Sequence, residues 1–162
     1  MAQTQTATRD AEDQASRATL RTGVILGVGA MGAIDEIVFH QLLQWHHFYS
    51  DTTAFRQIVS DGLLHLFTLT MLVLGALLLW RERHQLTAVV SDRPFWAGVL
   101  LGLGGFQLFD GIVDHKILRV HQVREDTANL LPYDLAWNAG AVLLLVAGGI
   151  IWRRHRAGRP GR

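Results

Sequence analysis

Two long stretches with no polar face constrain the fold of this chain more than any other sequence feature. Leu63–Trp80 spans 18 residues and has His65 as its only ionisable side chain, and Leu135–Trp152 has one strongly polar residue, Asn138. A helix rises about 1.5 Å per residue, so about 20 residues cross the apolar core of a bilayer. A helix that is apolar all round must be buried in protein or lipid. Both stretches therefore predict membrane-spanning helices.

Two further apolar stretches, Gly23–Ile34 and Phe95–Phe109, are shorter and run directly into polar sequence. They reach the length of a span only if the polar residues that follow remain helical and face protein or water. With that condition, the sequence predicts an all-α fold with a four-helix transmembrane domain over residues 21–153. A soluble four-helix core is the alternative, and the absence of any polar face on the two longest stretches disfavours it.

The polar ends of the chain are predicted to lie outside the membrane. Residues 1–20 lack the central apolar run of a cleavable signal peptide, and their composition predicts a disordered cytoplasmic tail. Residues 154–162 are predicted to form a basic cytoplasmic tail.

Lysine and arginine predict the orientation of the chain in the membrane. Eleven of them lie near the termini or in the link between the second and third spans, and four lie on the other side. The eleven are Arg9, Arg17, Arg21, Arg81, Arg83, Arg93, Arg153, Arg154, Arg156, Arg159 and Arg162. The four are Arg56, Lys116, Arg119 and Arg124. Because basic residues are enriched in cytoplasmic loops, we expect a multi-pass membrane protein with both termini in the cytoplasm.

The pattern Asp-x4-His-x5-His occurs twice, at an offset of 75 residues. Its members are Asp35, His40 and His46 in the first copy, and Asp110, His115 and His121 in the second. The start of the next span also corresponds, because Asp61–His65 aligns with Asp134–Asn138 at an offset of 73. The sequence thus predicts two parallel helical-hairpin repeats, about 21–81 and 94–153, related by a two-fold axis along the membrane normal. Such an axis would gather the polar ends of the hairpins into one shared site.

The helical period limits what one helix can present to that site. Residues five apart on a regular helix differ by about 140°, so Asp35 and His40 are expected on different faces, as are Asp110 and His115. We therefore expect a site assembled between helices. The inner candidate ligands are His40, His65 and His115, with Asp35 and Asp110 as ligands or as partners that orient the imidazoles. Candidates for secondary or rim positions are His46, His47, His121, Asp61, Asp114, Asp134, Asn138 and Glu36.

These side chains favour a transition-metal site. Imidazole and carboxylate groups on facing helices suit Zn, Fe, Mn or Cu(II). The absence of cysteine excludes thiolate ligands and disfavours a dedicated Cu(I) site, and nothing in the pattern singles out haem. The rivals are a hydrogen-bonded structural network, a proton or cation path, and an enzyme with a metal-activated water near His40 and His115. A path across the membrane is disfavoured because Gly23–Ile34 and Met71–Trp80 contain no ionisable group. No nucleic-acid-binding face is present.

The stretch from Asp35 to His47 resembles a family of small bacterial membrane proteins known as domain of unknown function 2243. The likeness continues through Asp61–His65, Phe109–His115 and Tyr133–Asn138, and it covers roughly residues 23–152. The resemblance implies a four-helix integral membrane protein of a bacterial inner membrane, without an assigned reaction. The family's association with cytochrome oxidase assembly genes implies metal handling and a respiratory membrane complex as partner.

Two positions depart from the pattern of that family. Glu36 stands where the family usually has glycine, and Gln122 follows His121 where a His-His pair is common. These departures affect the outermost candidate ligands and not His40, His65 or His115.

Overall fold

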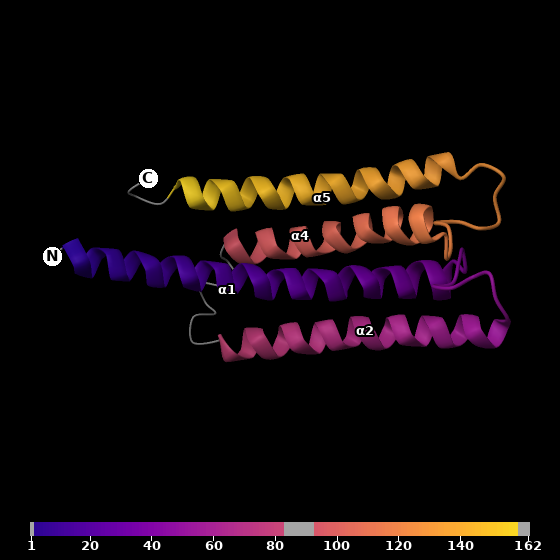
Figure 1. Ribbon diagram of the computed structural model, residues 1–162, viewed down its shortest axis with the longest axis horizontal. Helices are drawn as coiled ribbons and strands as arrows, with labels where there is room; N and C mark the ends of the chain where they lie inside the picture. Colours follow the sequence, from indigo (N-terminus) through magenta and orange to yellow (C-terminus); the bar gives the residue numbers. More distant parts are fainter. Residues whose placement is uncertain (1, 83–92, 159–162) are drawn as a thin grey trace.

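The computed structural model describes residues 2–82 and 93–158, and in these parts the chain is helical apart from its loops (Figure 1). The elements in order are α1 (Ala2–Ile34), η1 (Asp35–Leu42), α2 (Ala54–Arg81), α4 (Arg93–Phe109), η3 (Asp110–Leu118) and α5 (Leu131–Ala157). The segments η1 and η3 are π-helices that continue α1 and α4 without a break. Four helices are long and apolar enough to cross a membrane: Thr6–Leu42, Ala54–Arg81, Arg93–Leu118 and Leu131–Ala157. The predicted all-α fold with four spans is confirmed.

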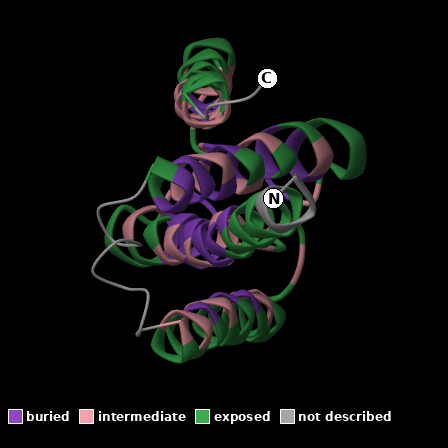
Figure 2. Ribbon diagram, turned by 90° about the vertical axis from the view of Figure 1, so that its left-hand side faces the viewer, coloured by how far each residue is buried: buried purple, intermediate pink, exposed green. Residues whose placement is uncertain are grey.

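The four long helices lie in a row, in the order α5, α4, α1, α2 (Figures 1 and 2). The helices α1 and α4 run in the same direction and form the central pair, and α2 and α5 flank them on opposite sides. The start of α1 and the end of α5 lie at the same end of the long helices. The π-helices and the loops 43–53 and 119–130 lie at the opposite end, called the loop end below.

The central pair is packed tightly because glycines face each other across it. A Cβ atom added to Gly102 would lie 2.9 Å from the backbone nitrogen of Val28 and 3.0 Å from Cα of Gly27, and it would clash with the carbonyl oxygen of Val24. Gly27 meets the backbone of α4 in the same way, at Val99, Gly102 and Leu103. Small residues allow membrane helices to approach this closely, and the approach brings the ends of α1 and α4 together.

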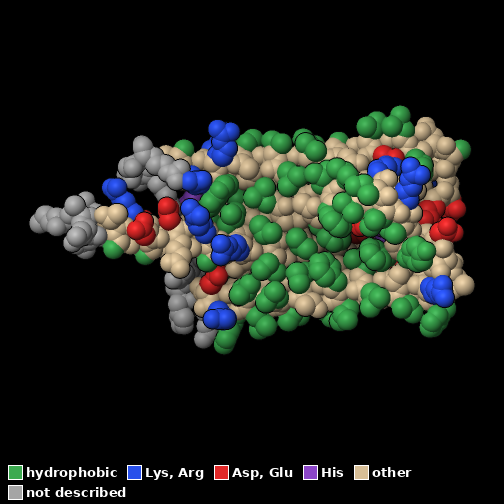
Figure 3. All heavy atoms as spheres, in the orientation of Figure 1, with side chains coloured by type: hydrophobic (Ala, Val, Ile, Leu, Met, Phe, Trp, Pro, Cys, Tyr) green, Lys and Arg blue, Asp and Glu red, His purple; other side chains and the backbone are tan. Residues whose placement is uncertain are grey.

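The outer helices present apolar side chains to the surroundings. Large exposed hydrophobic residues lie along α2 and α5, and a broad hydrophobic belt covers the middle of the molecule (Figure 3). Lysine and arginine side chains gather near the end where the termini lie. A soluble protein rarely exposes an apolar surface of this extent, whereas a bilayer covers it.

A small core lies beneath the loop end, between α1, α4 and α5. It consists of Met31, Val123 and Trp137 with partly buried hydrophobic neighbours. Gln107 Nε2 donates to the carbonyl of Trp137 at 2.9 Å, and Trp137 Nε1 donates to the carbonyl of Gln107 at 3.0 Å. This reciprocal pair fixes α5 against α4.

The chain is helical from Ala2, where a disordered tail over residues 1–20 is expected from composition. The segment is rich in alanine and glutamine, which are good helix formers. It also extends a helix that is already formed, so it avoids the unfavourable step of nucleation. Three of the arginines used to predict the orientation, Arg83, Arg159 and Arg162, lie outside the described residues.

Candidate metal centre

The π-helical geometry of η1 and η3 brings each aspartate of the repeated pattern onto the face of the first histidine. In a π-helix the backbone hydrogen bonds join residues five apart, so side chains at that spacing lie nearly above one another. His40 Nε2 lies 3.5 Å from Asp35 Oδ2, and His115 Nε2 lies 3.2 Å from Asp110 Oδ2. The expectation that these pairs point about 140° apart is therefore wrong. It assumed a regular α-helix where the structure has π-helices.

A left-handed residue after each π-helix then folds the chain back over the helix end. These residues are Gln44, with φ of 50°, and Arg119, with φ of 54°. Next to them, Trp45 N donates to the carbonyl of Phe39 at 2.9 Å, and Val120 N donates to the carbonyl of Asp114 at 3.0 Å. Non-glycine residues in this conformation are uncommon and cost of order 1–3 kcal/mol, and they cluster at functional sites.

The reversed chain places a second histidine against each aspartate. His46 Nε2 lies 3.7 Å from Asp35 Oδ1, and His121 Nε2 lies 3.2 Å from Asp110 Oδ1. The first triad is thus Asp35, His40 and His46, and the second triad is Asp110, His115 and His121. Within each triad, one ligand atom from every residue lies within 4.8 Å of the others. All six residues are buried, and their side chains are at most 4% exposed.

The two triads form one centre. The rings of His46 and His121 stack with centroids 4.7 Å apart and an interplanar angle of 14°. The rings of His40 and His46 lie 4.5 Å apart, and those of His115 and His121 lie 4.6 Å apart. The two longer distances between ring centroids of different triads are also nearly equal, at 6.3 Å for His40 to His121 and 6.2 Å for His46 to His115.

The loops lock the tautomers of the two stacked histidines. His46 Nδ1 donates to the carbonyl of Val123 at 2.9 Å, and His121 Nδ1 donates to the carbonyl of Phe48 at 2.9 Å. A carbonyl oxygen only accepts, so Nδ1 carries the proton in each ring. When the ring is neutral, its Nε2 atom therefore carries a lone pair, which points toward the aspartate. A backbone carbonyl on the other ring nitrogen is also the usual support of a metal-bound histidine.

The same loops are tied to each other over the centre. Ser50 N donates to the carbonyl of Val120 at 3.1 Å, and Glu125 N donates to the carbonyl of Trp45 at 3.0 Å. These two bonds, like the pairs described above, correspond at an offset of 75 residues. The matching geometry is what two repeats would produce, and the internal repeat itself stays a prediction.

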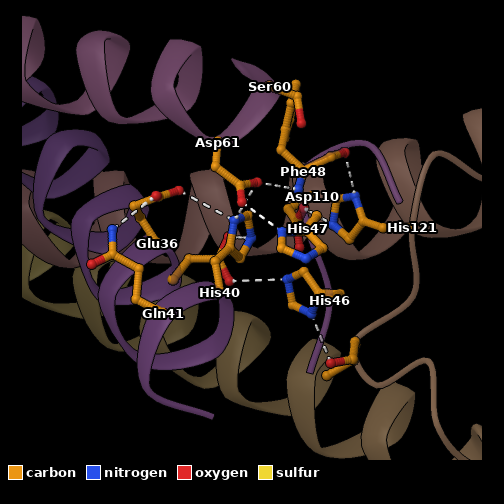
Figure 4. A network of polar contacts seen from close by, with 12 residues as sticks. Glu36, His40, Gln41, His46, His47, Phe48, Ser60, Asp61, Asp110 and His121 are labelled. Carbon is orange, nitrogen blue, oxygen red and sulfur yellow. Dashed lines mark hydrogen bonds and ion pairs between the residues drawn. The ribbon is translucent and has the colours of Figure 1, made fainter. Parts of the chain in front are cut away.

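A third group of possible ligands, called the flanking group below, consists of Glu36, His40 and Asp61. His40 Nδ1 lies 3.2 Å from Glu36 Oε2 and 3.1 Å from Asp61 Oδ1 (Figure 4). The other oxygen of Asp61 accepts from His47 Nδ1 at 2.6 Å, and Phe48 N donates to Asp61 at 2.7 Å. His40 therefore belongs both to the flanking group and to the first triad.

The acidic neighbours of His121 favour a positive charge on or beside its imidazole. Burial by itself lowers the pKa of His121, but the adjacent Asp110 carboxylate, the charge of Asp35 and the bond to the carbonyl of Phe48 together raise that pKa above its usual value. The described surroundings of the imidazoles are thus rich in negative charge.

The structure places three of the candidate residues differently from the expectation based on sequence. His65, expected as an inner ligand, is exposed on α2 and belongs to none of the three groups in the described chain. His46 and His121, expected at the rim, are 2% and 3% exposed and lie inside the triads. The cause lies in the π-helices and the chain reversals, which turn the second histidines inward.

The remaining candidates surround the centre. His47 is the most exposed member, with 35% of its side chain accessible, and Asp114 is buried. Asp134 binds Lys116, whose Nζ lies 2.5 Å from Asp134 Oδ2, and Asn138 Nδ2 donates to the carbonyl of Asp134 at 2.8 Å.

Sequence reasoning missed Lys116 and the backbone carbonyls of Phe48 and Val123. Lys116 carried a signal, since it is the basic residue directly after His115 and falls on the side of the chain with few basic residues. The two backbone carbonyls carried no sequence signal, because their positions depend on how the two loops pack over the centre.

Comparison with known proteins places the chain in a family of predicted membrane proteins. The family described as "Predicted membrane protein (DUF2243)" matches residues 22–155. No curated protein and no solved structure matches the chain. The matched range includes both triads, the flanking group and all four spans except the polar start of α1 and the last residues of α5.

Proposed function

Since the chain belongs to the DUF2243 family of predicted membrane proteins, we propose that it is an integral membrane protein that binds a transition metal in its two triads, at the loop end of the bundle. Each triad holds one ion through two imidazole nitrogens and one carboxylate. Zn, Fe, Mn and Cu(II) are the metals that such ligands suit.

One observation carries this proposal. The Nε2 atoms of all four triad histidines are buried, and none of them makes a hydrogen bond within the described residues. Each faces an aspartate oxygen at 3.2–3.7 Å. A neutral imidazole lone pair and a carboxylate repel each other unless a cation lies between them. The locked tautomers of His46 and His121 make a metal ion a fitting cation.

Protonated Nε2 atoms are the competing explanation. His40 and His115 could carry their single ring proton on Nε2, whereas His46 and His121, whose Nδ1 already carries a proton, would need a second one. Each triad would then be a buried ion pair, in which one imidazolium and one neutral imidazole donate to the carboxylate. Burying charges costs several kcal/mol per ion unless the pairing is excellent, and distances up to 3.7 Å are long for charge-assisted bonds. The stacked contact of His46 and His121 would also bring two like charges together.

Haem fits this geometry less well than free ions. Axial histidines bind the iron from opposite faces of the porphyrin, whereas the imidazoles here contact one another at 4.5–4.7 Å. No porphyrin plane can pass between rings at that separation.

The physiological role we propose is metal handling, including metal delivery during assembly of a respiratory enzyme in a bacterial inner membrane. Three protein ligands leave a coordination position open, which suits the transfer of an ion to a partner. The open position equally favours a metal-dependent membrane enzyme, in which bound water is activated and an aspartate acts as base. Metal transfer to an acceptor chelate without turnover distinguishes the first role from the second.

Elemental analysis of detergent-purified protein tests the metal directly. We expect about one ion per triad in the wild type after exposure to Zn²⁺, and its loss in the double variant His40→Ala, His115→Ala, because both triads then retain only one imidazole. His155→Ala is the matched control, since His155 lies at the opposite end of the molecule on α5. A wild-type protein that binds no ion would contradict the proposal.

The orientation is testable separately. The termini share one end of the bundle with most of the arginines, so we propose that this end is cytoplasmic and the metal centre faces outward. A phosphatase or fluorescent reporter fused after Arg162 is expected to behave as cytoplasmic. Reporter activity on the outer side would reverse the orientation.

A further inference from the structure

We infer that the flanking group of Glu36, His40 and Asp61 is a separate cation site through which a divalent metal ion passes from the loop end to the triads. This inference rests on the proposed function, because it assigns the route by which the triads are loaded. It adds a site with its own ligands, on the opposite side of the His40 ring.

The first support is the arrangement around Nδ1 of His40. Two carboxylate oxygens, from Glu36 and Asp61, lie 3.2 Å and 3.1 Å from this one nitrogen. A single N–H satisfies one of them. Glu36 Oε2 has no hydrogen-bond partner within the described residues, although Glu36 is only 2% exposed. A buried, unpaired carboxylate oxygen is costly, and a divalent cation held by Glu36, Asp61 and His40 would satisfy it.

The second support is the sharing of His40 between two groups. Its Nδ1 faces the flanking group and its Nε2 faces Asp35 of the first triad at 3.5 Å. With an ion on Nδ1, the ring proton resides on Nε2, and this N–H donates a hydrogen bond to Asp35. With the ion on Nε2, the ring proton resides on Nδ1, and this N–H donates a hydrogen bond to Asp61. A neutral His40 thus holds one ion at a time, and the ion and the ring proton exchange sides as the ion moves inward.

The third support is a gradient of exposure that ends at His40. The side chain of His47 is 35% exposed, that of Asp61 is 15% exposed, and that of His40 is fully buried. Asp61 contacts both histidines, at 2.6 Å and 3.1 Å (Figure 4). An ion bound by His47 and Asp61 therefore reaches Glu36 and His40 while it remains bound to Asp61.

The second half of the chain, as far as the structure describes it, lacks such a site. Gly111 stands where the first half has Glu36, and Lys116 stands where it has Gln41. The ammonium of Lys116 binds Asp134, the counterpart of Asp61, at 2.5 Å. This fixed positive charge repels a cation and leaves the carboxylate without a free charge to attract one. Loading through α1 and α2 alone explains why the two halves differ here while their triads match.

The test is the rate of metal uptake by full-length, chelator-stripped protein in detergent. Co²⁺ is mixed rapidly with the protein, uptake is followed by its visible absorption, and the final Co²⁺ content is measured by elemental analysis. Glu36→Gln keeps the shape and the bond with Gln41 but removes the charge. We expect uptake to slow by about 10-fold, because charge lining a cleft raises association rates by that order or more. The final Co²⁺ content of the triads is expected to match the wild type.

Two further variants guard against a trivial result. Asp61→Asn, on a different helix, is expected to slow uptake similarly, whereas Asp134→Asn is the matched control and is expected to load at the wild-type rate. Wild-type uptake rates in both Glu36→Gln and Asp61→Asn would overturn the inference and leave the proposed function standing. A final Co²⁺ content that falls as in the triad variants would also overturn it, by placing Glu36 in the triads. Failure of the wild type to take up Co²⁺ would overturn both proposals.

Discussion

His46→Ala and His121→Ala are each expected to lower the affinity for the bound metal by at least roughly 100-fold. Changing a residue that only supports a ligand typically costs 10–100-fold, and these two histidines supply ligand atoms themselves. Each substitution also removes one of the stacked rings that join the triads. The affinity is measured by titrating the protein with Zn²⁺ against a competing chelator.

His65→Ala is the control for this experiment. His65 is exposed on α2 and belongs to no triad in the described chain, so its removal is expected to leave the affinity unchanged. The reverse result, in which His65→Ala loses the metal and His46→Ala keeps it, would restore the assignment suggested by sequence and refute the geometry of the triads.

Gly102→Ala is expected to destabilise the protein by about 3 kcal/mol, at the upper end of the cost of overpacking. The added methyl group meets backbone atoms of Val24, Gly27 and Val28, which cannot move aside as a flexible side chain could. Separation of α1 from α4 would also displace one triad from the other. We expect a lower midpoint of thermal unfolding in detergent together with weaker Zn²⁺ binding.

Gly105→Ala on the same helix provides the matched control. A Cβ atom at Gly105 has no neighbour within 4 Å, and alanine is a better helix former than glycine. Its midpoint is expected to equal or exceed that of the wild type. Equal midpoints for Gly102→Ala and Gly105→Ala would show that the close contact of α1 with α4 does not hold the fold together.

Much of the fold could be predicted from the sequence because hydropathy is a local property of each segment. Leu63–Trp80 and Leu135–Trp152 have no polar face, so they could be predicted as membrane-spanning helices without knowledge of the rest of the chain. The arrangement of the helices in a row was less accessible. It depends on the close packing of α1 against α4 at Gly27 and Gly102, which only the packed structure specifies.

The candidate site was predictable in composition but not in geometry. The pattern Asp-x4-His was visible at Asp35 and at Asp110, yet its meaning depends on whether the backbone is α-helical or π-helical. A spacing of five that occurs twice was itself a signal of π-helix. His65 misled the assignment because its alignment with Asn138 says nothing about which side of α2 faces α1.

The triads and the flanking group together explain why so many ionisable side chains are buried at one end of a membrane protein. Intramembrane ionisable groups are expensive, so they persist where they bind one another or a ligand. In this chain the carboxylates of Asp35 and Asp110 face imidazole Nε2 atoms, and backbone carbonyls set the tautomers of His46 and His121. Two residues in the left-handed conformation hold these second histidines in place.

Metal-edge X-ray absorption of the Zn²⁺-loaded wild type tests the central claim most directly. We expect about two imidazole nitrogens per ion at about 2.0–2.1 Å, with carboxylate oxygen at about 2.0–2.2 Å and the outer-shell scattering typical of histidine rings. A zinc spectrum of oxygen ligands alone, without imidazole scattering, would contradict the assignment of the ions to the triads.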